Sequence, residues 1–202
     1  MAVVRFPGSN CDADTYRACE RVGAEPRYVW HREESLGNID VVMLPGGFAY
    51  GDHLRAGAIA RFSPIMRAVV EHARSGGPTL GICNGFQILC EAGLLPGALV
   101  RNACLTFISR PLSMRIEATN TPFTNAYSAG DTFDIPVAHG EGRFVAEDAE
   151  VARLEAEGLV VARYAHDNPN GSVNGIAGIC SDSRSIVGLM PHPERAADEL
   201  LS

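Results

Sequence analysis

A cysteine between two glycines, where a predicted strand meets a predicted helix, is the strongest chemical signal in the sequence. Residues 79–87 read TLGICNGFQ, with Cys83 at the corner. A tight strand-to-helix turn presses neighbouring side chains against the corner residue, so only small residues fit at Gly81 and Gly85. The N-terminus of the following helix directs free N–H groups and the positive end of its dipole at the sulfur, which favours the thiolate. The spacing therefore predicts a nucleophile at Cys83, with the N–H of Asn84 placed to donate to an oxyanion.

The alternative for Cys83 is a cysteine that only packs in the core, since cysteine is commonly buried. Cys11 offers an internal comparison, because it also follows a predicted strand and turn and precedes a predicted helix. Its neighbours at −2 and +2 are Ser9 and Ala13, which both carry a Cβ, so the fit to an elbow is poorer. Cys83 is the better nucleophile candidate. The remaining cysteines lie in apolar patterns and are expected in the core: Cys19, Cys90, Cys104 and Cys180.

A cysteine nucleophile that attacks an amide needs a base, and the base needs a group that orients it. Residues 191–194 read PHPE and follow a predicted strand. The proline after His192 favours extended backbone, in which residues i and i+2 face the same way, so Glu194 can reach the imidazole. The alternative is a turn made by the prolines, with an exposed histidine. Among the other histidines, His139 is the main rival for the base, because it also follows a predicted strand.

A glycine pair after another predicted strand supplies the third element. Gly46 and Gly47 follow the strand of residues 39–44, at an end where open α/β sheets bind ligands. A loop of this kind exposes backbone N–H groups and can supply the second oxyanion donor. A glycine pair is weak evidence by itself, because most such pairs are only turns.

These residues need a scaffold that brings distant segments together. The first half of the chain alternates short apolar strands with helices, which predicts a parallel sheet with helices on both faces. The second half has longer strands and a hairpin-like pair, which predicts antiparallel additions. Strands are predicted at residues 3–6, 27–30, 39–44, 79–82, 105–118, 132–138, 159–164, 175–180 and 185–190, and helices at 12–22, 58–74, 84–91 and 149–157. We expect one α/β domain over residues 1–202, with a flavodoxin-like open sheet.

Composition excludes several classes of function. The net charge is −7, so the surface lacks the basic excess that nucleic acid or an anionic membrane would require. All 17 basic residues are arginine, which excludes a Schiff-base lysine and a Walker A lysine. The N-terminus shows no signal-peptide h-region, and no apolar run is long enough to span a membrane. We therefore expect a reduced, cytoplasmic protein.

With these elements in place, the sequence resembles the class I glutamine amidotransferases. That family carries a catalytic cysteine on a G-x-C-x-G elbow, an upstream Gly-Gly oxyanion loop and a C-terminal His-x-Glu. The resemblance spans nearly the whole chain. Within the family, the sequence is most similar to glutaminase subunits that serve de novo purine biosynthesis. The segments that carry it are residues 7–12 (PGSNCD), 45–52 (PGGFAYGD), 83–87 (CNGFQ), 138–142 (AHGEG) and 191–195 (PHPER). Members usually continue through another helical stretch beyond residues 200–202.

The resemblance implies a complete reaction. Cys83 attacks the glutamine carboxamide, and the resulting γ-glutamyl thioester is hydrolysed with His192 as acid and base, oriented by Glu194. The N–H groups of Gly47 and Asn84 hold the oxyanion. Gln87, one turn into the elbow helix, helps to shape the glutamine pocket.

Ammonia then passes to a separate ATP-binding synthetase, PurL, often joined by a small third protein, PurS. PurL uses it to convert formylglycinamide ribonucleotide to formylglycinamidine ribonucleotide. The resemblance implies neither a cofactor nor a metal ion in the glutaminase chain itself.

Two other functions stay open on the residues alone. A hydrolase or peptidase can use an elbow cysteine on a similar sheet, but it would not be stimulated by a synthetase. A non-catalytic thiol redox sensor would use the oxidation of Cys83, but it would leave the His192-x-Glu194 pattern unexplained. Glutamine turnover with and without a partner separates these alternatives.

Overall fold

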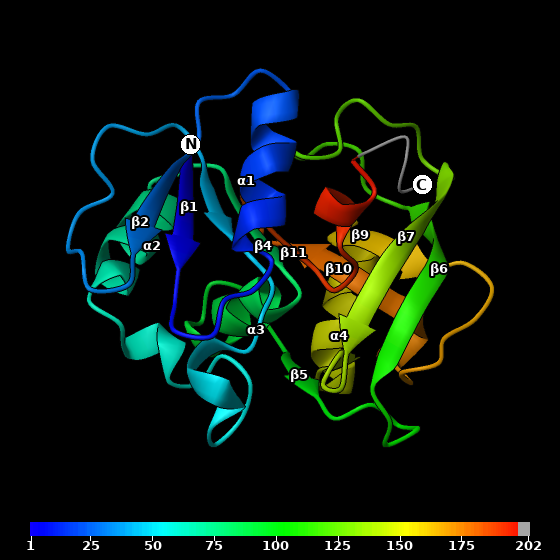
Figure 1. The fold of residues 1–202 in the computed structure, drawn as a ribbon. Helices are drawn as coiled ribbons and strands as arrows, with labels where there is room; N and C mark the ends of the chain where they lie inside the picture. Colours follow the sequence, from blue (N-terminus) through cyan, green and yellow to red (C-terminus); the bar gives the residue numbers. More distant parts are fainter. Residues whose placement is uncertain (198–202) are drawn as a thin grey trace.

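A computed structural model describes residues 1–197. It shows an α/β fold in which helices flank a mixed sheet of parallel and antiparallel strands (Figure 1). Within these residues a nine-stranded sheet has the order β2-β1-β3-β4-β11-β10-β9-β6-β7. The expected open sheet with a parallel centre and antiparallel additions is confirmed. Residues 200–202, after which relatives were expected to continue, lie outside the described part.

The parallel part of the sheet contains the strands that precede the candidate site residues. Its strands pair in register, for example β11 with β4 at Gly188 and Gly81. Each is short, and all except β2 are mainly buried, as expected for strands covered on both faces. In sheet order they are β2 (Arg27–Trp30), β1 (Ala2–Arg5), β3 (Val42–Leu44), β4 (Thr79–Ile82) and β11 (Ile186–Leu189).

The antiparallel part begins with the predicted hairpin. Strand β10 pairs antiparallel with β11, and each following pair in the sheet is antiparallel as well. The long pair β6 and β7 forms the far edge and places His139 opposite Ile108. In sheet order the strands are β10 (Ile176–Cys180), β9 (Val160–Tyr164), β6 (Ile108–Ile116) and β7 (Thr132–His139).

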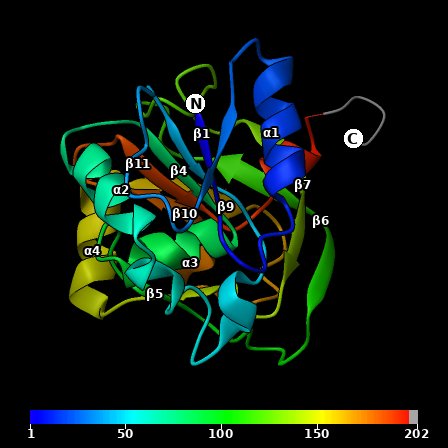
Figure 2. The ribbon, with the colours of Figure 1, turned by 60° about the vertical axis from the view of Figure 1, so that its left-hand side comes forward.

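Helices cover both faces of the sheet, as predicted. Figures 1 and 2 show α1 on one face and the other three helices on the opposite face. They are α1 (Asp12–Arg21), α2 (Ile65–Arg74), α3 (Asn84–Glu91) and α4 (Asp148–Ala156). None of the helices in residues 1–197 has the length and apolar character that a membrane crossing requires.

One local prediction was wrong, and one small sheet was not predicted. The helix expected over residues 58–74 begins only at Ile65, after a separate 3₁₀ turn at Ala60–Phe62. Proline has no N–H to donate and disfavours helical backbone at the residue before it, so Pro64 starts a new helix. A small second sheet, formed by β5 (Ala98–Val100) and β8 (Arg143–Val145), was not predicted. Its strands are only three residues long and far apart in the sequence.

The glycines that flank Cys83 are required sterically. A Cβ at Gly85 would lie 1.9 Å from the carbonyl oxygen of Leu44, and a Cβ at Gly81 would lie 2.6 Å from the backbone of Gly85. Strands β3 and β4 and helix α3 therefore approach one another too closely for any side chain. The elbow is fixed by backbone contacts rather than by side-chain packing.

We expect Gly85→Ala to lower the free energy of unfolding by about 3 kcal/mol or more, because the new methyl group must displace backbone. Chemical denaturation measures this directly. Gly93→Ala is the matched control: Gly93 has φ +66° but no atom within 4 Å of an added Cβ, so only the backbone penalty of about 1 kcal/mol applies. Equal effects of the two substitutions would contradict the steric account.

Candidate active site

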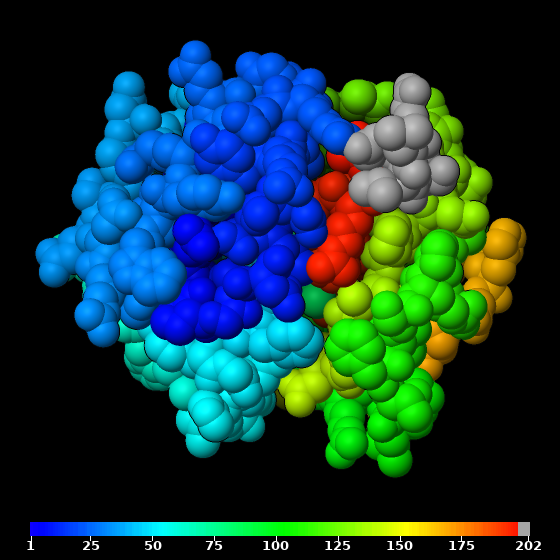
Figure 3. Space-filling view, viewed as in Figure 1, coloured from blue at the N-terminus to red at the C-terminus, as the bar shows by residue number. Residues whose placement is uncertain are grey.

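The candidate residues lie in loops at one edge of the sheet. Strands β1, β3, β4 and β11 are parallel and occupy neighbouring positions, so their carboxyl ends meet at the same edge. The loops that leave these ends carry Cys11, Gly46 and Gly47, Cys83, and His192. In the space-filling view, the red C-terminal segment lies between the blue N-terminal segment and the green to yellow-green β6 and β7 (Figure 3). Segments from the two ends of the chain thus meet here.

Cys83 occupies a strained elbow. Its backbone has φ 51° and ψ −105°, and it is the N-cap of α3. A non-glycine residue at positive φ persists only where the surrounding structure imposes it, and such strain clusters at functional sites. The N–H of Cys83 donates to the carbonyl of Leu189 at 2.7 Å, which ties the elbow to β11. By contrast, Cys11 caps α1 at negative φ, with φ −101° and ψ 9°.

The Cys83 thiol is held in its neutral form. It is 5% exposed, and burial raises its pKa, with further upward contributions from Cys11 and Glu194. The N–H of Asn84 lowers the pKa of Cys83, as expected for a helix N-terminus directed at the sulfur. The Sγ–H makes a weak hydrogen bond to the carbonyl of Ala138 at 3.8 Å. A base is therefore needed to remove this proton during attack.

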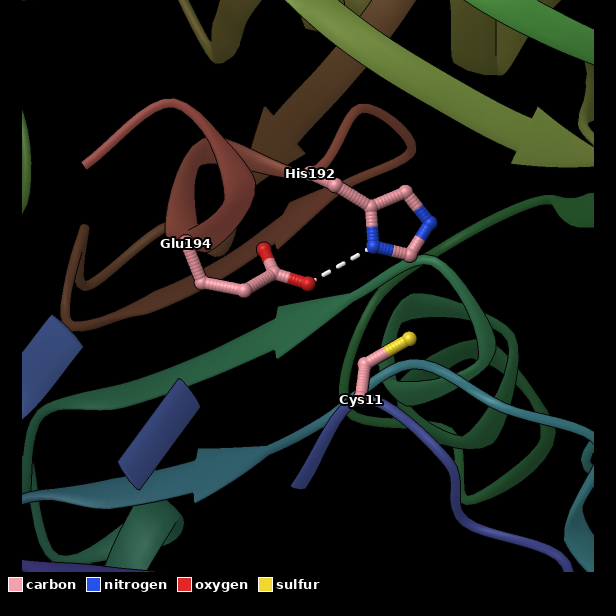
Figure 4. A group of neighbouring side chains, drawn as sticks. All are labelled: Cys11, His192 and Glu194. Atoms are coloured by element: carbon pink, nitrogen blue, oxygen red, sulfur yellow. Dashed lines mark hydrogen bonds and ion pairs between the residues drawn. The ribbon is translucent and has the colours of Figure 1, made fainter. Parts of the chain in front are cut away.

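His192 and Glu194 form a buried pair. His192 Nδ1 lies 2.7 Å from Glu194 Oε1, and both residues come from the segment that follows β11 (Figure 4). Their side chains are 1% and 2% exposed. The N–H of His192 donates to the carbonyl of Pro136, which anchors the segment to β7. Because Glu194 accepts from Nδ1–H, Nε2 carries the lone pair, and among the described residues it has no hydrogen-bond partner. Nε2 is therefore the ring nitrogen that can accept a proton.

Gly47 has a backbone that only glycine tolerates. Its φ is 149°, and a Cβ would lie 2.7 Å from Ser9 Cα and from the carbonyl oxygen of Gly8. Gly47 forms an isolated bridge with Ser9, through hydrogen bonds from the N–H of Phe48 to Gly8 and of Asn10 to Gly46. Neither bond uses the N–H of Gly47, which stays available for an oxyanion.

Two small cavities adjoin Cys83. One, of about 170 Å³, is lined by Asp52, Gln87, His139 and Glu141, among others; the second, of about 160 Å³, by Cys11, His192 and Arg195, among others. Both share a set of lining residues: Gly47, Phe48, Cys83, Phe107 and Ala138. The rings of Phe48 and Phe107 lie 6.5 Å apart and are about half exposed. Cys83 therefore faces an acidic cavity and the cavity that holds the candidate base.

The amide groups of Asn84 and Gln87 are occupied by one another and by neighbouring segments. Asn84 Nδ2 donates to Gln87 Oε1 at 2.8 Å, and Gln87 Nε2 donates to the carbonyl of Glu141 at 2.7 Å. Asn84 Oδ1 accepts from the N–H of Ala49, which joins α3 to the loop after Gly47. Gln87 thus shapes the cavity wall and links it to the residues after β7.

His139, the rival base, is fixed in a neutral form. Asn102 Nδ2 donates to the carbonyls of Thr106 and His139, so Asn102 Oδ1 is an acceptor and accepts a hydrogen bond from His139 Nδ1–H at 3.2 Å. Burial and the nearby His192 lower the pKa of His139 to about 4. Its Nε2 is buried and has no partner among the described residues. His139 hydrogen-bonds to an amide, whereas His192 has a carboxylate that can stabilise an imidazolium.

Sequence reasoning missed several contributors. Asp52 and Glu141 line the larger cavity, and burial together with Glu141 raises the pKa of Asp52 to about 6. Both residues lie in the segments PGGFAYGD and AHGEG, which were noted only for their resemblance. Cys11 was considered as a weaker elbow, and its position beside His192 was not foreseen. Cys104, expected in the core, is exposed because it lies in the loop after β5.

Comparison with known proteins decides the family. The profile of the CobB/CobQ-like glutamine amidotransferase domain matches residues 1–201. A Rubrobacter xylanophilus protein named phosphoribosylformylglycinamidine synthase subunit PurQ is 57% identical over 201 residues, which cover 100% of this chain and 91% of the relative. The chain belongs to the PurQ family.

Other PurQ relatives and solved structures agree with this assignment. The PurQ protein of Salinibacter ruber is 54% identical over 210 residues, covering 100% of this chain and 89% of the relative. A chain in the structure of PurLQS from Thermotoga maritima superposes with a TM-score of 0.91 at 46% identity, covering 100% of this chain and 90% of that one. Another glutamine amidotransferase from Thermotoga maritima has a TM-score of 0.62 at 18% identity, over 96% of this chain and 75% of its own, so it shares the fold.

Proposed function

We propose that this chain is the glutaminase subunit of a phosphoribosylformylglycinamidine synthase. It hydrolyses L-glutamine and delivers the ammonia to a synthetase that converts formylglycinamide ribonucleotide to formylglycinamidine ribonucleotide in purine biosynthesis. The observation that carries this proposal is full-length membership of the PurQ family. Cys83 and His192 line one cavity, and Glu194 is hydrogen-bonded to His192. These three side chains supply a nucleophile, a base and an orienting carboxylate for glutamine hydrolysis.

The first half of the reaction forms a thioester. Nε2 of His192 takes the thiol proton of Cys83 as the sulfur attacks the side-chain carbonyl carbon of glutamine. Glu194 stabilises the imidazolium through Nδ1–H. The N–H groups of Gly47 and Asn84 donate to the tetrahedral oxyanion. When the intermediate collapses, the C–N bond breaks and His192 returns its proton to the departing ammonia.

The second half regenerates the thiol. His192 removes a proton from a water molecule, which attacks the γ-glutamyl thioester, and the oxyanion forms again at the same two N–H groups. Collapse breaks the C–S bond, and the Cys83 sulfur recovers its proton from His192. The products are glutamate and ammonia, and every step uses side chains and backbone groups of this chain together with water.

Substrate recognition uses the acidic cavity. Asp52 and Glu141 present carboxylates that attract the α-ammonium group of glutamine. His139, neutral and with a lone pair on Nε2, accepts a hydrogen bond from the carboxamide N–H. A glutamate carboxylate has no N–H to offer this atom, so the product binds less well than the substrate.

The raised pKa of Asp52 predicts a pH dependence of KM. Above about pH 6 Asp52 is ionised and attracts the substrate; below that value it is protonated, and one negative charge is lost. We expect KM for glutamine to rise about tenfold as the pH falls through 6, a difference of ~1.4 kcal/mol. Asp52→Asn should show the high KM at every pH, whereas the exposed Asp134→Asn should behave as wild type. A pH profile of KM unchanged in Asp52→Asn would contradict this role.

The partners follow from the family. The Thermotoga maritima structure described above, at 46% identity, is that of PurLQS, and we propose that this chain assembles with PurL and PurS in the same way. PurL binds ATP and the ribonucleotide, so the complex acts as an ATP-dependent amide ligase. We place this assembly in the cytoplasm and treat residues 1–202 as one amidotransferase domain.

The test is glutamate release from glutamine by the isolated chain and by the chain with PurL and PurS. In the described residues the Cys83 proton is directed to Ala138 and Nε2 of His192 has no partner, so catalysis requires a small rearrangement. We expect the partners to supply it and to raise turnover by about 100-fold or more. Equal turnover with and without partners would favour a free-standing elbow-cysteine hydrolase. No glutamate in either case, from a folded chain, would favour a thiol redox sensor.

A further inference from the structure

Cys11 is a buried thiol that the proposed mechanism does not use. It lies in the loop between β1 and α1, is 2% exposed, and its side chain lies beside the His192–Glu194 pair (Figure 4). Its sulfur, a ring nitrogen of His192 and a carboxylate oxygen of Glu194 all lie within 4.8 Å of one another. The three side chains come from the two ends of the chain, so the fold and not local sequence creates this group.

Sulfur, imidazole nitrogen and carboxylate oxygen are the donors that Zn²⁺ prefers. With zinc bonds of about 2.0–2.3 Å, neighbouring donors in a tetrahedral site are about 3.3–3.8 Å apart. The three donor atoms lie within 4.8 Å of one another, so shifts of the side chains bring them to this spacing. His192 Nδ1 and Glu194 Oε1 are 2.7 Å apart, which is a hydrogen-bond distance. These two atoms must therefore move slightly apart when both bind an ion.

A second, independent observation indicates unfilled coordination at this place. His192 Nε2 and Glu194 Oε2 are buried and have no hydrogen-bond partner among the described residues. A buried polar atom without a partner costs free energy unless a substrate, water or ion reaches it. The mechanism above accounts for His192 Nε2. It leaves Glu194 Oε2 and the Cys11 sulfur unexplained.

We propose that Cys11, His192 and Glu194 form an inhibitory zinc site. On binding, Cys11 loses its thiol proton to solvent, and its sulfur and Glu194 bring two negative charges to the divalent ion. The fourth position faces the cavity that Cys83 also lines, where water or the Cys83 sulfur completes the coordination.

Arg195 supports the ion from outside the ligand set. Its Nη2 donates to the Cys11 sulfur at 3.1 Å, and a hydrogen bond of this kind is retained when a thiolate binds a metal. Asn10 Oδ1, which now accepts from the Cys11 sulfur at 3.2 Å, is released when the thiol is deprotonated.

Bound zinc blocks turnover whichever ring nitrogen of His192 it uses. If it occupies Nε2, the atom that exchanges protons with Cys83 is lost. If it occupies Nδ1, the imidazole proton moves to Nε2, so both the hydrogen bond to Glu194 and the lone pair that accepts the Cys83 proton are lost. The site thus makes turnover sensitive to zinc through Cys11, a residue that the chemistry does not need.

Metal binding is measured without turnover, so that its outcome is separate from that of the proposed glutaminase activity. The probe is Co²⁺, whose bond to a thiolate gives a charge-transfer absorption band, titrated into the full chain with Cys83→Ser. We expect one Co²⁺ per chain with this band. The band should vanish in Cys11→Ser/Cys83→Ser and persist in Cys104→Ser/Cys83→Ser, where the exposed thiol is removed instead. A band that persists without Cys11, or no band in the folded Cys83→Ser chain, would overturn the proposal.

Inhibition supplies the second readout, in the complex with PurL and PurS. Each variant is compared with its own turnover in the absence of zinc. We expect Cys11→Ser to raise the zinc concentration for half-inhibition by about 10–100-fold, and Cys104→Ser to leave it unchanged. An unchanged value in Cys11→Ser would mean that zinc acts on Cys83 and His192 alone, which contradicts the site. Should Cys11→Ser fail to fold, Cys11→Ala tests the same ligand.

Discussion

Replacing Cys83 by serine is expected to lower glutamine turnover by about 10⁴–10⁶-fold. In the proposed mechanism the Cys83 thiol is the protein group that forms a covalent bond to the substrate, and a serine hydroxyl is a far weaker nucleophile with the same base. The substitution nearly preserves the side-chain volume at this strained elbow, so the chain should stay folded. Glutamate release by the complex with PurL and PurS measures the effect, and thermal unfolding of both proteins checks the fold.

Cys11→Ser is the decisive companion to this variant, because Cys11 lines the same cavity and lies beside His192. We expect it to retain turnover within about tenfold in zinc-free buffer. The exposed Cys104→Ser controls for the loss of any one thiol. A large loss in Cys11→Ser with little loss in Cys83→Ser would make Cys11 the nucleophile and the strained elbow a structural feature.

His192→Asn should have the second-largest effect, a loss of about 10⁴-fold or more in turnover. Asparagine can neither take the Cys83 proton nor protonate the leaving ammonia, so both halves of the reaction lose their acid and base. The affinity for glutamine should change little, because the acidic cavity lies around Asp52 and Glu141. Turnover and KM of the complex measure these two consequences separately.

Substitutions of two other histidines serve as controls for this prediction. His166 is exposed, and His166→Asn should leave turnover unchanged. His139→Gln should mainly raise KM. The side-chain amide can still hydrogen-bond to the substrate carboxamide, but its donor and acceptor atoms differ in position from those of the imidazole, so binding weakens. Turnover that survives in His192→Asn but disappears in His139→Gln would identify His139 as the base.

Local sequence predicted the elbow because its geometry depends on adjacent residues. Gly81 and Gly85 have no room for a Cβ, as the pattern required, but the nearest atoms are neighbouring backbone of Leu44 and Gly85 and not the corner residue. The sequence likewise predicted that Glu194 reaches His192, and the two lie 2.7 Å apart, but Pro193–Arg195 form a 3₁₀ turn and not the expected extended segment. Both features are set within a few residues of the chain.

Features that depend on the order of strands could not be predicted in this way. The contact of Cys11 with His192 requires that the loop after β1 meet the segment after β11, and no local pattern encodes that neighbourhood. The hydrogen bond from His139 to Asn102 joins segments 37 residues apart and orients the imidazole. Burial and the nearby His192, which also depend on the packing of distant segments, lower the pKa of His139. Sequence alone therefore left the roles of Cys11 and His139 open.

The helix expected over residues 58–74 shows a different limit. Its apolar pattern continues across Pro64, but the backbone of proline and the residue before it does not support one unbroken helix. The apolar periodicity predicts which residues face the core. It does not predict at which residue the backbone hydrogen bonds of the α-helix begin. The error does not affect the site, because none of the residues of α2 lines either cavity beside Cys83.

The most direct test of the central claim is to trap the covalent intermediate. The complex with PurL and PurS is mixed with isotopically labelled glutamine, quenched in acid during turnover, and digested for peptide mass spectrometry. The mechanism predicts a γ-glutamyl thioester on Cys83, absent from Cys83→Ser. Label on Cys11, or glutamate release at full rate with no covalent adduct on Cys83, would contradict it.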